Sequence, residues 1–279
     1  MIRLMKPKVK IIVVCGPTAT GKSDYAVVLA KKIDGEIISA DSRQVYKGLD
    51  IGSGKITQKE MKGVPHYLLD VANPKRIFSV SQFQKKGEKA IQHILKKNKT
   101  PIIAGGTGFY IDSLLGLVLP EVGPNIQLRK ELNKKTPEEL FKILKKKDRA
   151  RAESIDRYNK VRLIRALEII ETLGKVPKQK RVLKYNVEWI YLDFPDDILK
   201  ERIHTRLLKR MKQGMIKEVE QLHGDGISFK RLEELGLEYR YIALYLQKKL
   251  SKQEMMEQLE SAIWHYVKRQ RTWFKKYNT

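Results

Sequence analysis

A glycine-rich segment between a β-branched run and an amphipathic run limits the folds open to this chain more than any other feature. Residues Gly16–Ser23 read Gly-Pro-Thr-Ala-Thr-Gly-Lys-Ser and fit the pattern G-x-x-x-x-G-K-[ST]. Val9–Cys15 before it predicts a buried strand, and Gly21–Ile33 after it predicts a helix with apolar residues at helical spacing. A strand, this loop and a helix in that order predict a P-loop, in which backbone N–H groups and a helix N-terminus cradle a phosphate.

Two polar side chains at the end of the loop could bind the phosphate or its metal ion in addition to the backbone N–H groups. Lys22 can bring a positive charge to the outer phosphate, and the Ser23 hydroxyl is an oxygen ligand of the kind that Mg²⁺ prefers. The loop indicates a polyphosphate or diphosphate ligand without deciding between the two. The predicted phosphate-binding residues are Gly16, Pro17, Thr18, Ala19, Thr20, Gly21, Lys22 and Ser23.

Strands and helices continue to alternate after the loop. Glu36–Ala40 and Pro101–Ala104 are predicted strands, and the amphipathic run Val80–Lys97 between them is a predicted helix. Val187–Phe194 predicts one more strand, which returns to the same sheet after a long excursion. This alternation predicts an α/β fold, a P-loop-containing doubly wound parallel sheet.

The excursion, residues 119–186, is mostly helical by its pattern. Arg157–Leu173 predicts a helix that Gly174 closes, and Thr136 begins a capping box ahead of another. We therefore predict a core made of residues 1–118 and 187–279, with 119–186 as a helical insertion lobe. The C-terminal part of the core is also predicted to be helical, at about residues 196–212, 230–235, 238–248 and 252–276.

The balance of charge predicts an anionic partner. The 279 residues include 57 Lys and Arg against 32 Asp and Glu, a formal net charge of +25. Residues 141–184 alone carry 15 basic and 5 acidic side chains. An excess of this size is typical of proteins that bind nucleic acid, although a lysine-rich proteome would also produce it.

The remaining composition excludes several classes of protein. No stretch approaches the 18 or so consecutive apolar residues of a membrane span, so no membrane partner is expected. The single cysteine, Cys15, cannot form an intrachain disulfide or a cysteine-based zinc site, and the five histidines lack metal-ligand spacing. We therefore expect a cytoplasmic protein.

A carboxylate follows the second predicted strand. Asp41 stands at the carboxyl end of Glu36–Ala40, the edge at which ligands bind in open α/β sheets. The strand Pro101–Ala104, in contrast, ends in glycines and lacks the Mg²⁺-binding Asp that a nucleotide-hydrolysing P-loop protein needs there. Asp41 is thus a candidate catalytic base, with a helix cap or a structural carboxylate as the plain alternative.

Motifs spread in order over nearly the whole chain resemble one enzyme family. They are Gly16–Ser23, Ser39–Tyr46, Asp50-Ile-Gly52 with Lys55, Val64–Asp70, Gly105–Tyr110, Arg162–Glu168, Thr172–Lys175, Gly236–Arg240, and Lys268-Arg269-Gln270 with Thr272-Trp273-Phe274. Any one block apart from the P-loop is weak, but the ordered set resembles the tRNA dimethylallyltransferase family. Residues 121–152 are the least family-like stretch, and the zinc finger that ends some members is absent from this sequence.

The resemblance implies transfer of a dimethylallyl group from dimethylallyl diphosphate to N6 of an adenosine. That adenosine lies 3′ of the anticodon in tRNAs that read codons beginning with U. Asp41 would take a proton from the amine, and Thr107 and the P-loop would stabilise the departing diphosphate. By resemblance, Arg206 is the arginine that neutralises the leaving group; it shares a predicted helix face with Arg202. Mg²⁺ on Ser23 is the expected cofactor.

The tRNA would bind through its anticodon stem-loop, with the target base splayed out into the pocket. The basic lobe is expected to grip the stem, Gln44 and Gln270 could read base edges, and Tyr239 could stack. A monomer is expected. The predicted tRNA-binding residues are Asp41, Ser42, Arg43, Gln44, Thr107, Arg129, Val161, Arg162, Leu163, Ile164, Arg165, Tyr239, Arg240, Lys268, Arg269 and Gln270.

Three other functions are compatible with parts of the sequence. A P-loop kinase acting on a small metabolite would explain the N-terminal third but not the basic lobe. A prenyltransferase acting on a free adenine nucleotide would share the chemistry with less need of so broad a cationic surface. A non-enzymatic RNA-binding protein is disfavoured because Lys22, Ser23, Asp41 and Thr107 are all present.

Overall fold

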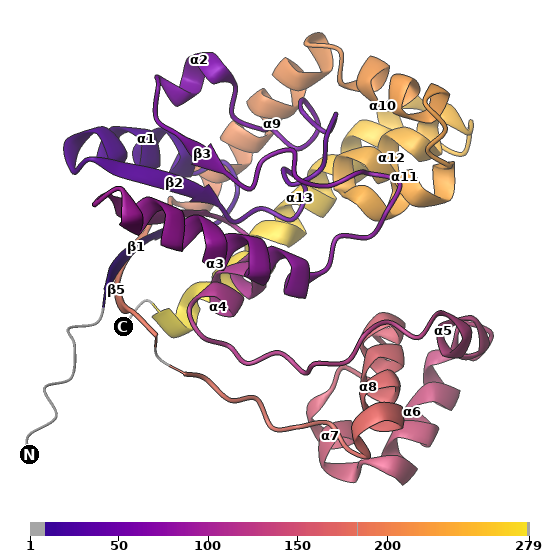
Figure 1. The fold of residues 1–279 in the computed structure, drawn as a ribbon. Helices are drawn as coiled ribbons and strands as arrows, with labels where there is room; N and C mark the ends of the chain where they lie inside the picture. The colour runs from indigo at the N-terminus through magenta and orange to yellow at the C-terminus, as the bar shows by residue number, and fades with distance from the viewer. Residues whose placement is uncertain (1–8, 183, 278–279) are drawn as a thin grey trace, which may run out of the picture. The chain divides into compact units, whose positions relative to one another are not determined.

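A computed structural model describes residues 9–182 and 184–277, and its centre is a five-stranded sheet (Figure 1). The strands are β1 (Lys10–Cys15), β2 (Gly35–Ser39), β3 (His66–Tyr67), β4 (Thr100–Gly105) and β5 (Asn186–Tyr191). Their order is β3-β2-β4-β1-β5, and every pairing is parallel. The predicted parallel sheet is therefore confirmed, and all its carboxyl ends meet at one edge.

Alternating side chains of the strands form two cores, one on each face of the sheet. On one face, Ile12 and Val14 of β1 pack with α1 (Lys22–Lys32). On the other face, Ile11 and Val13 join a larger cluster with α3 (Val80–Lys96) and α4 (Gly108–Leu114). Because both faces are covered, the sheet is doubly wound, as parallel sheets generally are.

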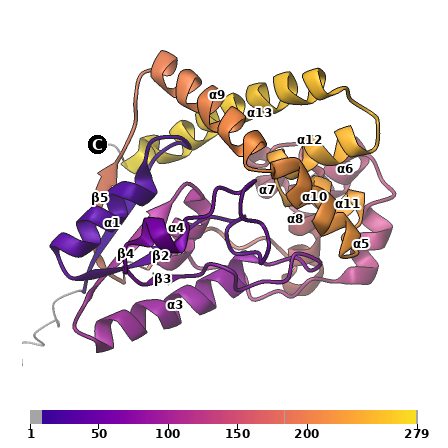
Figure 2. The ribbon, with the colours of Figure 1, turned by 90° about the horizontal axis from the view of Figure 1, so that it is seen from above.

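The C-terminal helices add to the larger of these cores (Figure 2). They are α9 (Asp196–Lys212), α10 (Met215–Gly224), α11 (Phe229–Leu235), α12 (Leu237–Leu246), α13 (Lys252–Phe274) and the 3₁₀ turn η1 (Lys275–Tyr277), while the short α2 (Gln58–Met61) lies earlier in the chain. The long α13 packs against α9, α12 and α4 and so connects the helical part to the sheet. No helix in the described part of the chain is long and apolar enough to cross a membrane.

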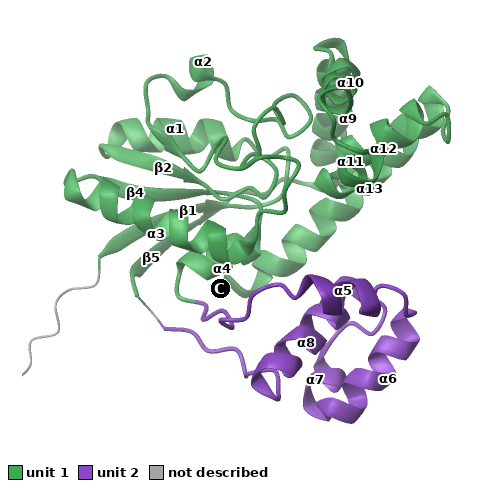
Figure 3. Ribbon diagram, turned by 45° about the vertical axis from the view of Figure 1, so that its right-hand side comes forward, with its two compact units in different colours: residues 1–116, 183–279 green, residues 117–182 purple. Residues whose placement is uncertain are grey.

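Residues 117–182 form a second compact unit (Figure 3). Its helices are α5 (Ile126–Leu132), α6 (Pro137–Lys147), α7 (Arg149–Ser154) and α8 (Lys160–Leu173). Leu140, Leu144 and Leu163 are among its buried residues, so the unit has a hydrophobic core of its own. The predicted lobe was 119–186; in the structure residues 184–186 belong to the first unit, because β5 begins at Asn186.

The two ends of this second unit run side by side. Leu117 forms an antiparallel bridge with Arg181, and the Val118 N–H donates to the Lys180 carbonyl at 2.9 Å. The chain therefore enters and leaves the unit through a paired neck.

Candidate active site

The P-loop follows β1 and closes on the N-terminus of α1. Gly16 has φ of +140°, and a Cβ there would lie 2.0 Å from the carbonyl oxygen of Leu192, so no side chain fits. Gly21, the residue before α1, is left-handed with φ of 78°. The Thr20 hydroxyl donates to the Pro17 carbonyl at 2.9 Å and braces the loop from inside. These features turn the loop around the start of α1, where backbone N–H groups favour an anion.

Lys22 folds back over the loop. Its ammonium donates to the Pro17 carbonyl and to the Thr20 hydroxyl, the latter at 3.4 Å. Burial, together with the positive charge of Arg206, lowers the pKa of Lys22 to about 8, although the charge of Asp41 opposes the shift. Two cations thus converge on this loop, which is an arrangement that a diphosphate would stabilise.

The loop opens into a cavity of about 680 Å³ at the carboxyl edge of the sheet. Its lining comes from the P-loop, from the ends of β2 and β4, from the loop after β2, and from α9 and α13. Polar lining residues include Lys22, Ser23, Asp24, Ser39, Asp41, Gln44, Ser53, Glu60, Glu201, Arg202, Thr205, Arg206, Lys209, Tyr266 and Gln270. All of them belong to the first unit.

Asp41 is held by its own loop, and Thr107 is hydrogen-bonded to the residues on either side of Asp41. The Asp41 carboxylate accepts the Arg43 N–H at 2.7 Å and the Gln44 N–H at 3.3 Å. The Thr107 hydroxyl accepts the Ser42 N–H at 3.1 Å, and the Thr107 N–H donates to the Ala40 carbonyl at 3.1 Å. The structure therefore brings together two of the three predicted catalytic residues, from adjacent strands that are far apart in sequence.

Arg206, the third predicted catalytic residue, reaches the cavity from α9. Burial, together with the charge of Arg210, lowers the pKa of Arg206 to about 10, although Glu238 and Asp41 oppose the shift. The guanidinium stays protonated near neutral pH, so it supplies a desolvated positive charge. Such a charge acts more strongly on a leaving group than one in open water.

Tyr266 is a site residue that the sequence did not single out. It comes from α13 and lines the cavity with Asp41. Burial, together with the charge of Asp41, raises the pKa of Tyr266 to about 12, so the phenol remains neutral. Gln270, which also lines the cavity, lies four residues later on the same helix. This spacing was the sequence signal that could have identified Tyr266 as a site residue.

Comparison with known proteins shows the family of this chain. A family model described as IPP transferase matches residues 44–277. The tRNA dimethylallyltransferase 2 of Treponema denticola is 47% identical over 272 residues, which cover 95% of this chain and 91% of that protein. This chain belongs to the tRNA dimethylallyltransferase, or IPP transferase, family.

Solved structures of the transferase family share the fold. The full-length tRNA isopentenylpyrophosphate transferase of Bacillus halodurans has 35% identity and a TM-score of 0.71, over 98% of this chain and 88% of that one. A eukaryotic dimethylallyltransferase acting on tRNA has 26% identity and a TM-score of 0.82, over 95% of this chain and 70% of that one. The kinase alternative is therefore not favoured.

Several predicted RNA contacts of this transferase lie at the surface or at the cavity. Asp41, Gln44 and Gln270 line the cavity together with the P-loop. Val161 and Arg162 are exposed at the start of α8. Arg240, Lys268 and Arg269 are also exposed; the Arg240 side chain donates to the Glu233 carbonyl at 3.0 Å, and the Arg43 side chain to the Glu234 carbonyl at 3.2 Å. None of these placements tests RNA contact.

Other residues predicted to contact tRNA have buried side chains in this structure. Leu163 and Ile164 face the core of the second unit because they lie on the apolar side of α8. Tyr239 has no exposed surface and hydrogen-bonds Glu218 at 2.9 Å, so it cannot stack on a base. Gln270 is 4% exposed; its amide oxygen accepts the Thr18 N–H, and its amide nitrogen donates to the Gly106 carbonyl.

Two predicted arginine contacts form ion pairs within the second unit. Arg129 places two nitrogens 2.6 and 2.7 Å from the buried Glu168 carboxylate, and Arg165 adds a third contact at 3.0 Å. These hydrogen bonds and charges hold the pKa of Glu168 below its usual range despite burial, which acts in the opposite direction. The pairing stabilises α8 against α5 and occupies part of each guanidinium, while about a third of each side chain remains exposed.

Proposed function

We propose that this chain transfers a dimethylallyl group from dimethylallyl diphosphate to N6 of the adenosine 3′ of the anticodon, in tRNAs reading codons that begin with U. The observation that carries the proposal is that Asp41 lines one cavity with the cations Lys22 and Arg206, while Thr107 is hydrogen-bonded to Ser42, the residue after Asp41. Family membership supports the reaction class.

The reaction breaks the bond between the prenyl C1 and the diphosphate oxygen and forms a bond between C1 and N6. The exocyclic amine is a poor nucleophile because its lone pair is delocalised into the ring. Asp41 accepts the N6 proton as the new bond forms. The P-loop amides, Lys22 and Arg206 neutralise the charge that develops on the diphosphate, and the Thr107 hydroxyl lies at the same strand edge to orient the reactants.

Magnesium fits this site through Ser23. The described residues hold no cluster of three acidic, histidine or cysteine side chains, so the protein alone offers the ion few ligands. A serine hydroxyl at the phosphate loop together with diphosphate oxygens is a hard-oxygen set that suits Mg²⁺. When bound, the ion would neutralise part of the diphosphate charge.

The second unit is proposed to hold the anticodon stem. Its exposed Val161 and Arg162, and the basic excess of residues 141–184, suit a phosphate backbone. A tRNA substrate implies a cytoplasmic site of action, and the proposal needs only one copy of the chain.

The direct test is incubation with unmodified tRNA, Mg²⁺ and dimethylallyl diphosphate, followed by mass analysis of the digested nucleosides. A gain of about 68 daltons on adenosine is expected from adding the five-carbon unit with loss of one proton. Free AMP replaces tRNA in a parallel reaction, and ATP turnover is measured without RNA. Modified AMP with unmodified tRNA, or ATP turnover alone, would contradict the proposal.

A further inference from the structure

The loop of residues 50–55 forms one wall of the donor cavity. Ser53 and Gly54 line the cavity with Lys22 and Arg206. The loop is a tight turn, in which the Gly54 N–H donates to the Ile51 carbonyl at 3.1 Å and the Lys55 N–H to the Asp50 carbonyl at 2.9 Å. The position of this loop therefore limits the space in which the diphosphate would lie.

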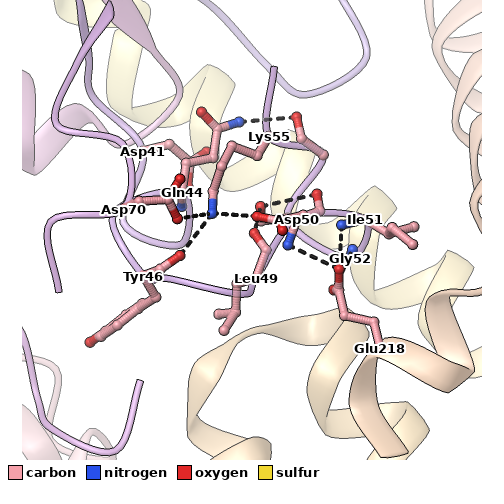
Figure 4. Close-up of polar contacts among 12 residues, drawn as sticks. Asp41, Gln44, Tyr46, Leu49, Asp50, Ile51, Gly52, Lys55, Asp70 and Glu218 are labelled. Carbon is pink, nitrogen blue, oxygen red and sulfur yellow. Dashed lines mark hydrogen bonds and ion pairs between the residues drawn. The ribbon is translucent and has the colours of Figure 1, made fainter. Parts of the chain in front are cut away.

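One carboxylate on α10 binds the backbone of this loop (Figure 4). Glu218 accepts the N–H groups of Asp50 at 3.0 Å, Ile51 at 2.6 Å and Gly52 at 3.0 Å. Three consecutive amides converging on one anion form the kind of concavity that usually holds a bound phosphate or carboxylate. Here the anion is a side chain of the protein itself.

Tyr239 extends the same contact by one residue. Its hydroxyl donates to Glu218 at 2.9 Å and accepts the Ser53 N–H at 3.1 Å. Burial and the neighbouring Glu218 charge raise the pKa of Tyr239, so the phenol keeps the proton that it donates. The loop is consequently held by four successive backbone amides, 50–53.

The opposite end of the loop is fixed by a lysine. The Lys55 ammonium contacts the Tyr46 carbonyl at 2.8 Å, Asp50 at 2.6 Å and Asp70 at 2.5 Å (Figure 4). The Lys55 side chain is only 6% exposed. The loop of residues 50–55 is therefore held on one side by Glu218 and at its end by Lys55.

The fastened loop in turn holds the arginines of α9. Arg210 donates to the Gly52 carbonyl at 3.2 Å and lies 3.5 Å from Glu238. Gly54 has φ of +59°, and a Cβ there would lie 1.6 Å from Arg210 Nη2 and 2.5 Å from Arg206 Nη2. The backbone at Gly54 and the charge of Arg210 thus limit where the Arg206 guanidinium can lie.

We propose that Glu218 is a positioning residue of the transferase: by fixing the loop of residues 50–53, it holds the Arg206 guanidinium at the diphosphate site. Glu218 touches no substrate and acts through the loop and Arg206. The inference deepens the proposed function and rests on it for the identity of the diphosphate donor.

The test compares Glu218→Gln with Glu220→Gln. Glu220 lies exposed on the same helix, so the control removes the same charge without touching the loop. In Glu218→Gln an amide NH₂ faces backbone N–H groups, so part of the contact is lost. The dissociation constant for inorganic diphosphate, measured by calorimetry, is expected to rise about tenfold for Glu218→Gln and to stay unchanged for Glu220→Gln. Removal of a negative charge alone would act in the opposite direction.

A double-mutant cycle shows whether the effect passes through Arg206. In the background of Arg206→Ala, Glu218→Gln is expected to add little further loss of diphosphate affinity, because the group that it positions is gone. Additive losses would overturn the inference. In the transfer reaction, Glu218→Gln should lower kcat and raise the KM for dimethylallyl diphosphate, with the KM for tRNA near that of Glu220→Gln. An unchanged kcat and donor KM would also overturn it.

Tyr239→Phe provides a second route should Glu218→Gln fail to fold. It removes one hydrogen bond to Glu218 and the acceptor for Ser53, so a rise of about threefold in the diphosphate dissociation constant is expected. No rise would overturn the inference. Diphosphate binding needs neither RNA nor prenyl chemistry, so these results stand even if tRNA modification is not found. Conversely, if the wild-type protein modifies tRNA and the variants bind diphosphate as well as it does, only the proposed role of Glu218 is excluded.

Discussion

Gln270 offers a sharp test of how the helical part supports the phosphate loop. Its amide oxygen accepts the Thr18 N–H at 2.9 Å, and its amide nitrogen donates to the Gly106 carbonyl at 3.0 Å. One side chain from α13 thus joins the P-loop to the end of β4. Gln270→Leu keeps a similar volume and removes both hydrogen bonds, leaving the two backbone groups without their partner.

The expected loss of stability follows from the burial of those two groups. The Gly106 carbonyl is in a buried residue, and an unsatisfied buried acceptor costs about 1–3 kcal/mol. Thr18 is only half-buried, so water can reach its N–H and the loss there is about 1 kcal/mol. The free energy of unfolding should therefore fall by about 2–4 kcal/mol, which for a protein of this size lowers the melting temperature by roughly 5–15 °C.

Thermal unfolding followed by circular dichroism measures this loss. Gln258→Leu is the matched control because Gln258 is exposed on the same helix, and its effect should stay within about 0.5 kcal/mol. A melting temperature for Gln270→Leu within about 2 °C of the control would refute the reasoning, since the two hydrogen bonds would then contribute nothing measurable.

Three further predictions concern the chemistry and the RNA. Asp41→Asn keeps an oxygen for the Arg43 and Gln44 N–H groups but cannot take a proton, so turnover should fall by at least about 100-fold with unchanged tRNA binding; a near-normal rate would remove Asp41 as the base. Burial lowers the pKa of Lys22 to about 8, so the free enzyme loses this charge as the pH rises past that value; diphosphate affinity measured by calorimetry should fall there, and Lys22→Arg should remove most of the fall. Replacing the exposed lysines of α6 with glutamine should flatten the salt dependence of tRNA affinity, and an unchanged slope would show that the second unit does not grip the RNA.

Local signals in the sequence located most of the elements. The predicted helix 196–212 matches α9, and the capping boxes at Thr136 and Ser251 begin α6 and α13 as expected. The strands β1, β2 and β4 lie within a residue of their predicted bounds, because β-branched runs bounded by glycine and polar residues are strong signals. In contrast, the two-residue β3 and the helix α10, whose N-cap Gly214 has no side chain to cap it, offered little to detect.

The candidate site was predictable where it depends on strand ends. Parallel strands end at one edge, so the sequence alone was enough to place Asp41 and Thr107 together. Tyr266 and Gln270 reach the same edge only through the packing of α13, more than 150 residues away along the chain, and no local pattern encodes that packing. Tyr239, in contrast, was considered for stacking because it is aromatic, although its ring fills the interior.

The paired neck of the second unit has a consequence for protein engineering. Because Leu117 and Arg181 face each other across an antiparallel bridge, the distance between the incoming and outgoing strands is short. A tight hairpin turn can therefore replace everything between them without stretching the remaining chain. The two compact units are in that sense separable, and the second unit of a relative can be grafted onto this neck without redesigning the first unit.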